Sequence, residues 1–159
     1  MELVLVRHGE ASLKAASDRQ RELTERGHAQ VQVAASWLAA NWPPERLLVS
    51  PFLRAQQTAA AFQAAMPSLL SESAEFLTPD TRLITMNDEI AKIDAERVLL
   101  IGHNPLFSNA ISWFCGQQLR EVMAPASMAC IELPLVHRDA GTLRWLRHAP
   151  DYAHIARRQ

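Results

Sequence analysis

The chain has 159 residues, a typical length for one domain, and we expect a single domain over residues 1–159. Hydrophobic residues make up 48% of the chain and charged residues 21%, which is the composition of a folded globular protein and excludes a disordered one. The 16 basic and 17 acidic residues give a formal net charge of −1. This balance gives no reason to expect a nucleic acid or a membrane surface as partner.

The cysteines and the N-terminus indicate a cytoplasmic protein. Cys115 and Cys130 are the only two cysteines, and neither lies in a zinc-ligand or disulfide-framework pattern. The apolar run Leu3–Val6 has no basic segment before it and is far too short for a signal peptide or a membrane span. We therefore expect reduced thiols and a cytoplasmic location.

The N-terminal third of the chain is predicted to form a buried strand followed by a helix. Leu3–Val6 is a short continuous apolar run, which is typical of a strand buried on both faces. Thr24 is a favourable N-cap for a helix that runs to about Asn41, before two prolines. Apolar residues of this helix recur on one predicted buried face, at Ala29, Val33, Trp37 and Ala40.

A second buried strand followed by a helix is predicted next in the chain. Arg46–Val49 is predicted to be a buried strand. Ser50 is then predicted as the N-cap of a helix that has Pro51 at its first position and ends at about Ala65. Arg54 falls in the first turn of this helix.

The rest of the chain completes an α/β pattern. Residues 67–85 are predicted to be mostly loop, with one short strand near Phe76. A helix is predicted over Met86–Asp94 and a buried strand over Arg97–Ile101. A further helix runs to Cys115 and is ended by Gly116. The last two strands, Met128–Leu135 and Thr142–Arg147, are predicted to form a hairpin. The alternation predicts a single three-layer α/β sandwich with a mostly parallel central sheet and an antiparallel strand near one edge.

Basic and imidazole side chains follow the three predicted buried strands at their carboxyl ends. Arg7 and His8 follow the first strand, Arg54 lies just after the second, and His103 follows the third. Because ligands of open α/β sheets bind beyond the carboxyl ends of the strands, these side chains would meet if the strands are neighbours. Guanidinium groups, imidazoles and helix N-termini together suit a tetrahedral phosphate.

Four sequence elements carry a family resemblance. They are Leu5-Val6-Arg7-His8-Gly9-Glu10, Leu23-Thr24-Glu25-Arg26-Gly27, the decapeptide SPFLRAQQTA that starts at Ser50, and Leu100-Ile101-Gly102-His103-Asn104. In this order they resemble the motifs of the histidine phosphatase superfamily, which has the phosphoglycerate-mutase-like fold. The short length and the residues around Asp18 and Arg21 resemble its small SixA-type phosphohistidine phosphatases in particular.

The resemblance implies a mechanism and a set of site residues. It makes His8 the nucleophile, which attacks phosphorus and forms a phosphohistidine that water then hydrolyses. Arg7, Arg54 and His103 would bind the phosphate oxygens and stabilise the transferred group. Arg21 is a further candidate phosphate contact, and the alternative for it is a solvated ion pair with Asp18. No cofactor and no metal ion are implied.

The chain differs from larger members of the family in the residue that would protonate the leaving group. Those members supply a carboxylic acid between the second and third strands, whereas Glu72, Glu75 and Asp80 lie in a stretch with no matching motif. Glu75 is the best candidate for a general acid. Since an imidazole can leave already protonated, a site without a well-placed acid suits a phosphohistidine on a phosphorelay or phosphotransfer protein.

Two alternative functions stay open at this point. One is a small-molecule phosphomonoesterase of the same superfamily, and the other is a module that binds phosphohistidine without cleaving it. Intact His8, Arg7, Arg54 and His103 argue against pure binding, because binding alone does not require a nucleophile.

Overall fold

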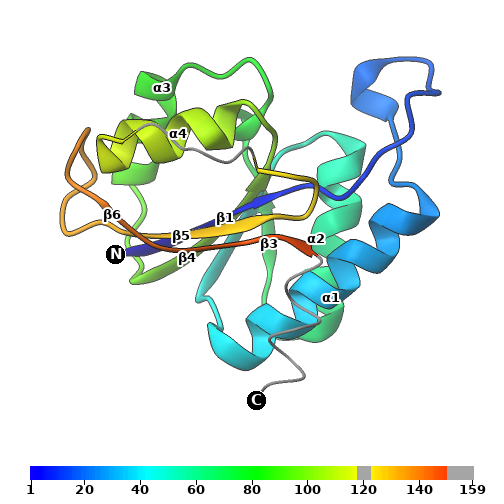
Figure 1. The fold of residues 1–159 in the computed structure, drawn as a ribbon, viewed down its shortest axis with the longest axis horizontal. Helices are drawn as coiled ribbons and strands as arrows, with labels where there is room; N and C mark the ends of the chain where they lie inside the picture. The colour runs from blue at the N-terminus through cyan, green and yellow to red at the C-terminus, as the bar shows by residue number, and fades with distance from the viewer. Residues whose placement is uncertain (118–122, 150–159) are drawn as a thin grey trace.

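In the computed structural model, which describes residues 1–117 and 123–149, the chain forms one mixed six-stranded sheet with helices on both faces (Figure 1). The strands are β1 (Glu2–Arg7), β2 (Arg46–Val49), β3 (Ser71–Ser73), β4 (Arg97–Gly102), β5 (Met128–Glu132) and β6 (Thr142–Arg147). The helices are α1 (Glu25–Asn41), α2 (Leu53–Ala65), α3 (Leu83–Ala91) and α4 (Leu106–Cys115), with two short 3₁₀ helices, η1 (Asp18–Gln20) and η2 (Glu75–Leu77).

The strand order is β3-β2-β4-β1-β5-β6. The first four strands of this order are parallel, β5 is antiparallel to β1, and β6 is antiparallel to β5. The predicted α/β sandwich with a mostly parallel sheet and an antiparallel strand near one edge is therefore confirmed.

Successive side chains of the central strand β1 point to opposite faces of the sheet and so contribute to two separate parts of the core. Leu3 and Leu5 point into the core under α3 and α4, whereas Val4 and Val6 point into the core under α1 and α2. All four side chains have 0% exposure, which explains why the strand reads as a continuous apolar run.

The register of the sheet brings the carboxyl ends of β1, β2 and β4 to one edge. Arg7 pairs with Gly102, and Val49 pairs with Ile101. His8, Ser50 and His103 are the residues that directly follow β1, β2 and β4, so they lie near one another at this edge of the sheet.

The buried face of α1 differs from the predicted one. The buried residues of α1 are Gly27, Val31, Ala34, Ala35 and Leu38, of which the last three pack in the core beneath the helix. Val33 is 41% exposed, and Trp37 is only half-buried, against Trp145. Both sets of residues have helical spacing, and close approach of the helix to the sheet selects the one with smaller side chains.

Several predicted boundaries were wrong, including the ends of the predicted helix Met86–Asp94 and strand Met128–Leu135, which the structure places at Ala91 and Glu132. Helix α2 begins at Leu53, so Ser50 is not its N-cap and a turn separates the two. The short strand β3 precedes the predicted position, and Phe76 lies in η2. Helix α3 begins at Leu83, three residues before the predicted start. Among the described residues, no helix has the length and apolar character needed to cross a membrane.

Candidate active site

The imidazole of His8 is held in one tautomer by contacts on both of its nitrogens. Nδ1 lies 2.7 Å from the carbonyl oxygen of Gly9, an acceptor only, so Nδ1 carries the proton. On the other side of the ring, Arg54 Nε donates to His8 Nε2 across 3.2 Å. Nε2 therefore presents a lone pair beside a guanidinium, which is the arrangement a nitrogen nucleophile needs.

The surroundings of His8 keep its ring neutral. Burial lowers the pKa of His8 to about 4, and the charges of Arg54, Arg7 and Arg21 act in the same direction. The hydrogen bond to Gly9 opposes this shift and is outweighed. At neutral pH the imidazole is thus unprotonated on Nε2 and able to attack.

His103 stands next to His8, with ring centroids 5.3 Å apart. Its Nε2 lies 2.7 Å from Ser50 Oγ, which itself accepts a hydrogen bond from the backbone N–H of Phe52. The Ser50 hydroxyl proton is then free to donate to Nε2, which favours the tautomer with a proton on Nδ1. Burial lowers the pKa of His103 to about 3, with further lowering by His8 and Arg54.

Two buried nitrogen atoms in this cluster have no hydrogen-bond partner within the described residues. They are Nε of Arg7 and Nδ1 of His103. A buried donor without a partner costs about 1–3 kcal/mol, so such groups are favourable only where a ligand satisfies them. A tetrahedral oxyanion, which has several acceptor oxygens, fits both nitrogens.

Arg54 connects the site to the segment that follows β1. Its side chain is only 5% exposed, and all of its nitrogen atoms are engaged. Besides His8, it contacts the carbonyl oxygen of Asp18 with Nη1 at 2.6 Å and the carboxylate of Asp18 with Nη2 at 3.3 Å. These contacts fix the plane of the guanidinium beside His8 Nε2.

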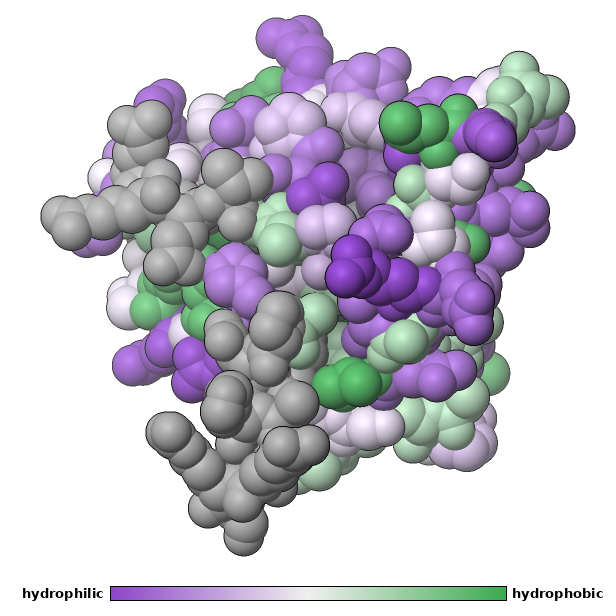
Figure 2. Space-filling model, turned by 45° about the vertical axis from the view of Figure 1, so that its right-hand side comes forward, coloured by the Kyte–Doolittle hydropathy of each residue, from purple (hydrophilic) through white to green (hydrophobic). Residues whose placement is uncertain are grey.

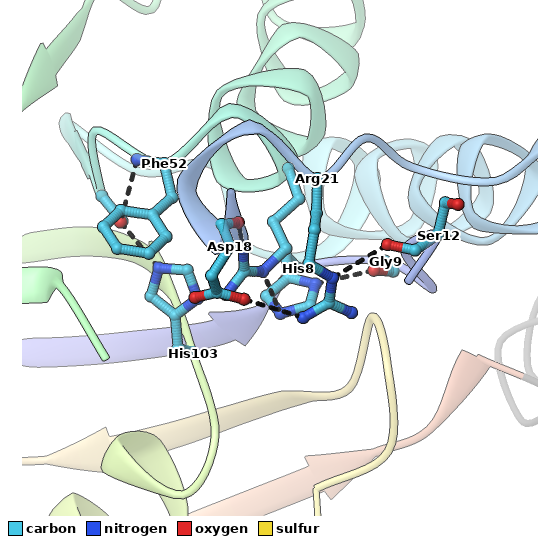
Figure 3. A network of polar contacts seen from close by, with 9 residues as sticks. His8, Gly9, Ser12, Asp18, Arg21, Phe52 and His103 are labelled. Atoms are coloured by element: carbon cyan, nitrogen blue, oxygen red, sulfur yellow. Dashed lines mark hydrogen bonds and ion pairs between the residues drawn. The ribbon is translucent and has the colours of Figure 1, made fainter. Parts of the chain in front are cut away.

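Arg21 lies at the edge of the same cluster (Figure 3). Its Nε donates to the carbonyl oxygen of Ser12 at 2.8 Å, and its Nη1 donates to the Asp18 carboxylate at 3.1 Å. Arg21 is therefore paired with Asp18, as the alternative interpretation of this residue held, and its charge also reaches His8. Asp18 itself was not among the site residues expected from the sequence.

Glu75 lies on the rim of the site and not in the cluster. Its side chain is 81% exposed, and its carboxylate is 3.8 Å from Nη2 of Arg19.

Two motif residues on α2 hold the site together in a way that the sequence alone did not reveal. The buried hydroxyl of Thr58 donates to the carbonyl oxygen of Arg54 at 2.8 Å and accepts from the backbone N–H of Gly9 at 3.2 Å. The side-chain oxygen of Gln57 accepts from the backbone N–H of Leu23 at 2.8 Å. Helix α2 therefore positions both the residue after His8 and the segment carrying Asp18.

Gly27 permits a close approach between α1 and the residues after His8. A Cβ atom at Gly27 would lie 2.1 Å from the carbonyl oxygen of Glu10. That oxygen accepts a hydrogen bond from the backbone N–H of Thr24, the N-cap of α1. Any larger residue at this position would push the segment after β1 away from the helix.

The segment before β5 supports Arg7 and His8 through its backbone. The carbonyl oxygen of Met123 accepts from Arg7 Nη1 at 2.6 Å, and the N–H of Ala126 donates to the carbonyl oxygens of Arg7 and His8. The N–H groups of Ala126 and Ser127 are used within the protein, Ser127 donating to the carbonyl oxygen of Ala124. Within residues 1–117 and 123–149, no group of three or more His, Cys, Asp or Glu residues is arranged to hold a metal ion.

Comparison with known proteins places this site in a family. The family model of the histidine phosphatase superfamily, branch 1, matches residues 3–77. Phosphohistidine phosphatase SixA of Escherichia coli strain K12 is 33% identical over 152 residues, which cover 91% of this chain and 92% of that protein. The SixA homolog of Haemophilus influenzae is 30% identical over 141 residues, covering 81% of this chain and 86% of that protein.

Comparison with solved structures supports the same family. The solved structure of the protein histidine phosphatase SixA complexed with tungstate matches with a TM-score of 0.83 and 30% identity, covering 95% of this chain and 99% of that chain. The chain therefore belongs to the histidine phosphatase superfamily, as its motifs predicted, and it is a hydrolase of that superfamily.

Proposed function

We propose that the protein is a phosphohistidine phosphatase, which removes phosphate from a phosphohistidine on a phosphorelay or phosphotransfer protein through a covalent phospho-His8 intermediate. One observation carries the proposal. His8 is neutral, its Nδ1 proton is held by Gly9, and its Nε2 lone pair lies 3.2 Å from the Nε of Arg54. A phosphoryl group bound by that guanidinium is therefore adjacent to the attacking atom.

In the first step, His8 Nε2 attacks phosphorus in line with the bond to the substrate. The new bond forms between phosphorus and Nε2, the bond between phosphorus and the substrate nitrogen breaks, and its electron pair returns to the substrate imidazole. His8 then carries positive charge, which the carbonyl oxygen of Gly9 stabilises through Nδ1–H. In the second step, water attacks phosphorus, and the electron pair of the P–N bond returns to Nε2 as phosphate leaves.

The remaining residues of the cluster bind and stabilise the group in transfer. Arg7, Arg54 and His103 provide donors for the nonbridging oxygens, and Arg21 is a further, peripheral contact. Catalysis of phosphoryl transfer rests mainly on such positioning and on stabilisation of the oxygen charges. The buried donors of Arg7 and His103 that have no partner in the described residues support this assignment.

Two features favour a phosphohistidine substrate over a phosphate ester. Glu75, the candidate acid, is exposed on the rim, and an alkoxide leaving group depends on a protonated acid more than an imidazole does. The two rim arginines are each paired with a carboxylate, Arg19 with Glu75 and Arg21 with Asp18. The rim therefore offers little net positive charge to a small substrate that carries further anionic groups.

Accessibility of the site supports a protein substrate in the cytoplasm. The side chain of Asp18, which binds Arg54, is 57% exposed, so the polar network that includes Arg54 extends to the protein surface at this point. Figure 2 brings this end of the molecule forward and shows mainly hydrophilic residues, with apolar ones in small separate patches. Both cysteines within the described chain are free thiols, in keeping with a reducing compartment.

The test is a comparison of substrates. The purified protein is incubated with a panel of phosphohistidine-carrying domains, with sugar phosphates and with p-nitrophenyl phosphate, and phosphate release is measured. A kcat/KM that is highest for a phosphohistidine protein supports the proposal. Preference for a sugar phosphate would identify a small-molecule phosphomonoesterase instead, and binding without phosphate release would identify a non-catalytic module.

A further inference from the structure

The carboxylate of Asp18 lies among the cations that are expected to bind the substrate phosphoryl group. It is 3.3 Å from Nη2 of Arg54 and 3.1 Å from Nη1 of Arg21 (Figure 3). The charge of the carboxylate also acts on His103. Nothing in the phosphoryl-transfer chemistry described above uses this carboxylate.

Asp18 is an anion in this position and not an acid. Its partial burial favours the protonated form, but the hydrogen bond from Arg21 and the charge of Arg54 outweigh that effect and hold the pKa of Asp18 below its usual value. The carboxylate therefore has no proton to give to a leaving group at neutral pH.

A phosphoryl group that binds Arg54 brings negative charge close to the carboxylate of Asp18. Arg54 already uses Nε for His8, Nη1 for the carbonyl oxygen of Asp18 and Nη2 for its carboxylate. Nη2 carries a second N–H, but a phosphoryl oxygen bound there brings its negative charge beside the carboxylate, and the repulsion displaces the carboxylate from its 3.3 Å contact. The displaced carboxylate stays near the site, because Arg21 binds it and because its main chain is anchored by the 2.6 Å bond to Nη1.

We propose that Asp18 is a specificity-determining residue, whose displaced carboxylate accepts the ring N–H of a phosphohistidine substrate. The proposal rests on the proposed function. In its protonated form, which an adjacent carboxylate favours, a phosphorylated imidazole carries an N–H on its second nitrogen. This donor replaces the contact that the carboxylate loses at Arg54. Inorganic phosphate and phosphate esters of simple alcohols and phenols bring no such donor, so for them displacement of the carboxylate is uncompensated.

The same carboxylate affects the leaving group during transfer. The P–N bond breaks with its electron pair returning to the imidazole, and the proton on the second ring nitrogen stays there, hydrogen-bonded to Asp18. The leaving group is then a neutral imidazole, which an adjacent anion does not repel. An ester would generate an alkoxide or phenolate beside that anion, which raises the barrier.

The test uses Asp18→Asn, which keeps the size of the side chain and removes its charge. Phosphoimidazole and p-nitrophenyl phosphate are the two substrates, and inorganic tungstate serves as an oxyanion probe whose Kd is measured by calorimetry. We expect the ratio of kcat/KM for phosphoimidazole to that for p-nitrophenyl phosphate to fall about tenfold, and tungstate to bind about tenfold more tightly, a change of about 1.4 kcal/mol in each case.

Glu22→Gln is the matched control. Glu22 is an exposed carboxylate on the same segment, and it contacts Gln57 rather than an arginine of the site. The Glu22→Gln substitution makes the same change in net charge as Asp18→Asn. The ratio of the two kcat/KM values and the Kd for tungstate should therefore both stay within twofold of the wild type. Asp18→Ser provides the same comparison if the asparagine variant does not fold.

The outcomes separate the two claims. An unchanged substrate ratio, or tungstate affinity that is unchanged or weaker, overturns the role of Asp18 even if the wild-type protein hydrolyses phosphohistidine well. A wild-type protein that hydrolyses p-nitrophenyl phosphate but neither phosphoimidazole nor phosphohistidine overturns the proposed function itself, and with it the assignment of Asp18.

Discussion

Arg54 donates a hydrogen bond from Nε to Nε2 of His8 across 3.2 Å, which joins residues 46 positions apart in the chain. The contact has two consequences. It requires an unprotonated Nε2, because that atom is the acceptor, and it places a fixed cation beside the atom that is expected to attack phosphorus. The adjacent parallel strands β2, β4 and β1 make this contact possible.

Replacement of His8 by alanine should remove the covalent route. We expect kcat/KM to fall at least about 10³-fold, because the remaining donors bind phosphate but cannot form a phosphoenzyme. Tungstate should still bind, since both arginines remain. Turnover and trapping of a labelled phosphoenzyme measure this, with the exposed His28→Ala as the control. Near-normal turnover in the His8 variant would show that another residue is the nucleophile.

Arg54→Lys should be costly although it keeps the charge. Lysine cannot reproduce the planar fork that reaches His8 and a phosphoryl oxygen together. Losing one preorganised donor to a developing oxyanion typically costs about 10²–10³-fold in turnover. The controls are Arg46→Lys and Arg97→Lys, at the opposite ends of β2 and β4, where the side chains pair with Glu72 and Glu2. Similar losses in all three variants would contradict the assignment of Arg54.

Stability should depend on pH through the two buried histidines. His8 and His103 have pKa values of about 4 and about 3 in the folded state, below the ordinary value of 6.5. At pH values between the folded and the ordinary pKa, the unfolded chain binds more protons than the folded chain. The free energy of unfolding should therefore decrease as pH falls from about 6.5 to about 4. Each histidine contributes at most about 1.4 kcal/mol per pH unit.

Urea denaturation at a series of pH values measures this dependence. The slope should be shallower in His8→Asn, because that variant lacks one of the two groups. An identical slope in the variant would mean that His8 titrates alike in the folded and unfolded chain.

Thr58→Val should affect both stability and activity. The valine matches the shape of threonine but leaves the backbone N–H of Gly9 without its acceptor. We expect a loss of about 1–3 kcal/mol in the free energy of unfolding, together with a lower kcat from misplacement of His8. Thr85→Val, on the exposed side of α3, is the control for each measurement. Unchanged kcat in the Thr58 variant would argue that Gly9 keeps its position without this bond.

Activity should survive an excess of EDTA. In the proposed mechanism, Arg7 and Arg54 neutralise the charge on the phosphoryl oxygens, a task that metal ions perform in other phosphatases. The measurement is phosphate release before and after chelation. Loss of turnover that a divalent cation restores would require a different mechanism.

The fold class and the residues that gather at the sheet edge could be predicted from the amino-acid sequence. Strands buried on both faces read as apolar runs, and parallel strands bring their carboxyl ends to one edge, so His8, Arg54 and His103 could be expected together. The four motifs determined the family. For α1 the sequence was not sufficient, because an alanine-rich helix has more than one apolar stripe, and only packing against the sheet selects between them.

The contacts that hold these residues, and the other groups that lie among them, could not be predicted in this way and are seen in the folded chain. Asp18 lies between Arg54 and Arg21, Thr58 binds Gly9, and the backbone of Met123 binds Arg7. Each of these contacts involves a residue outside the strands and α-helices, where no periodic sequence pattern predicts its position. Such segments are positioned by individual hydrogen bonds to distant parts of the chain, and those bonds exist only once the sheet and its helices have brought their partners within reach.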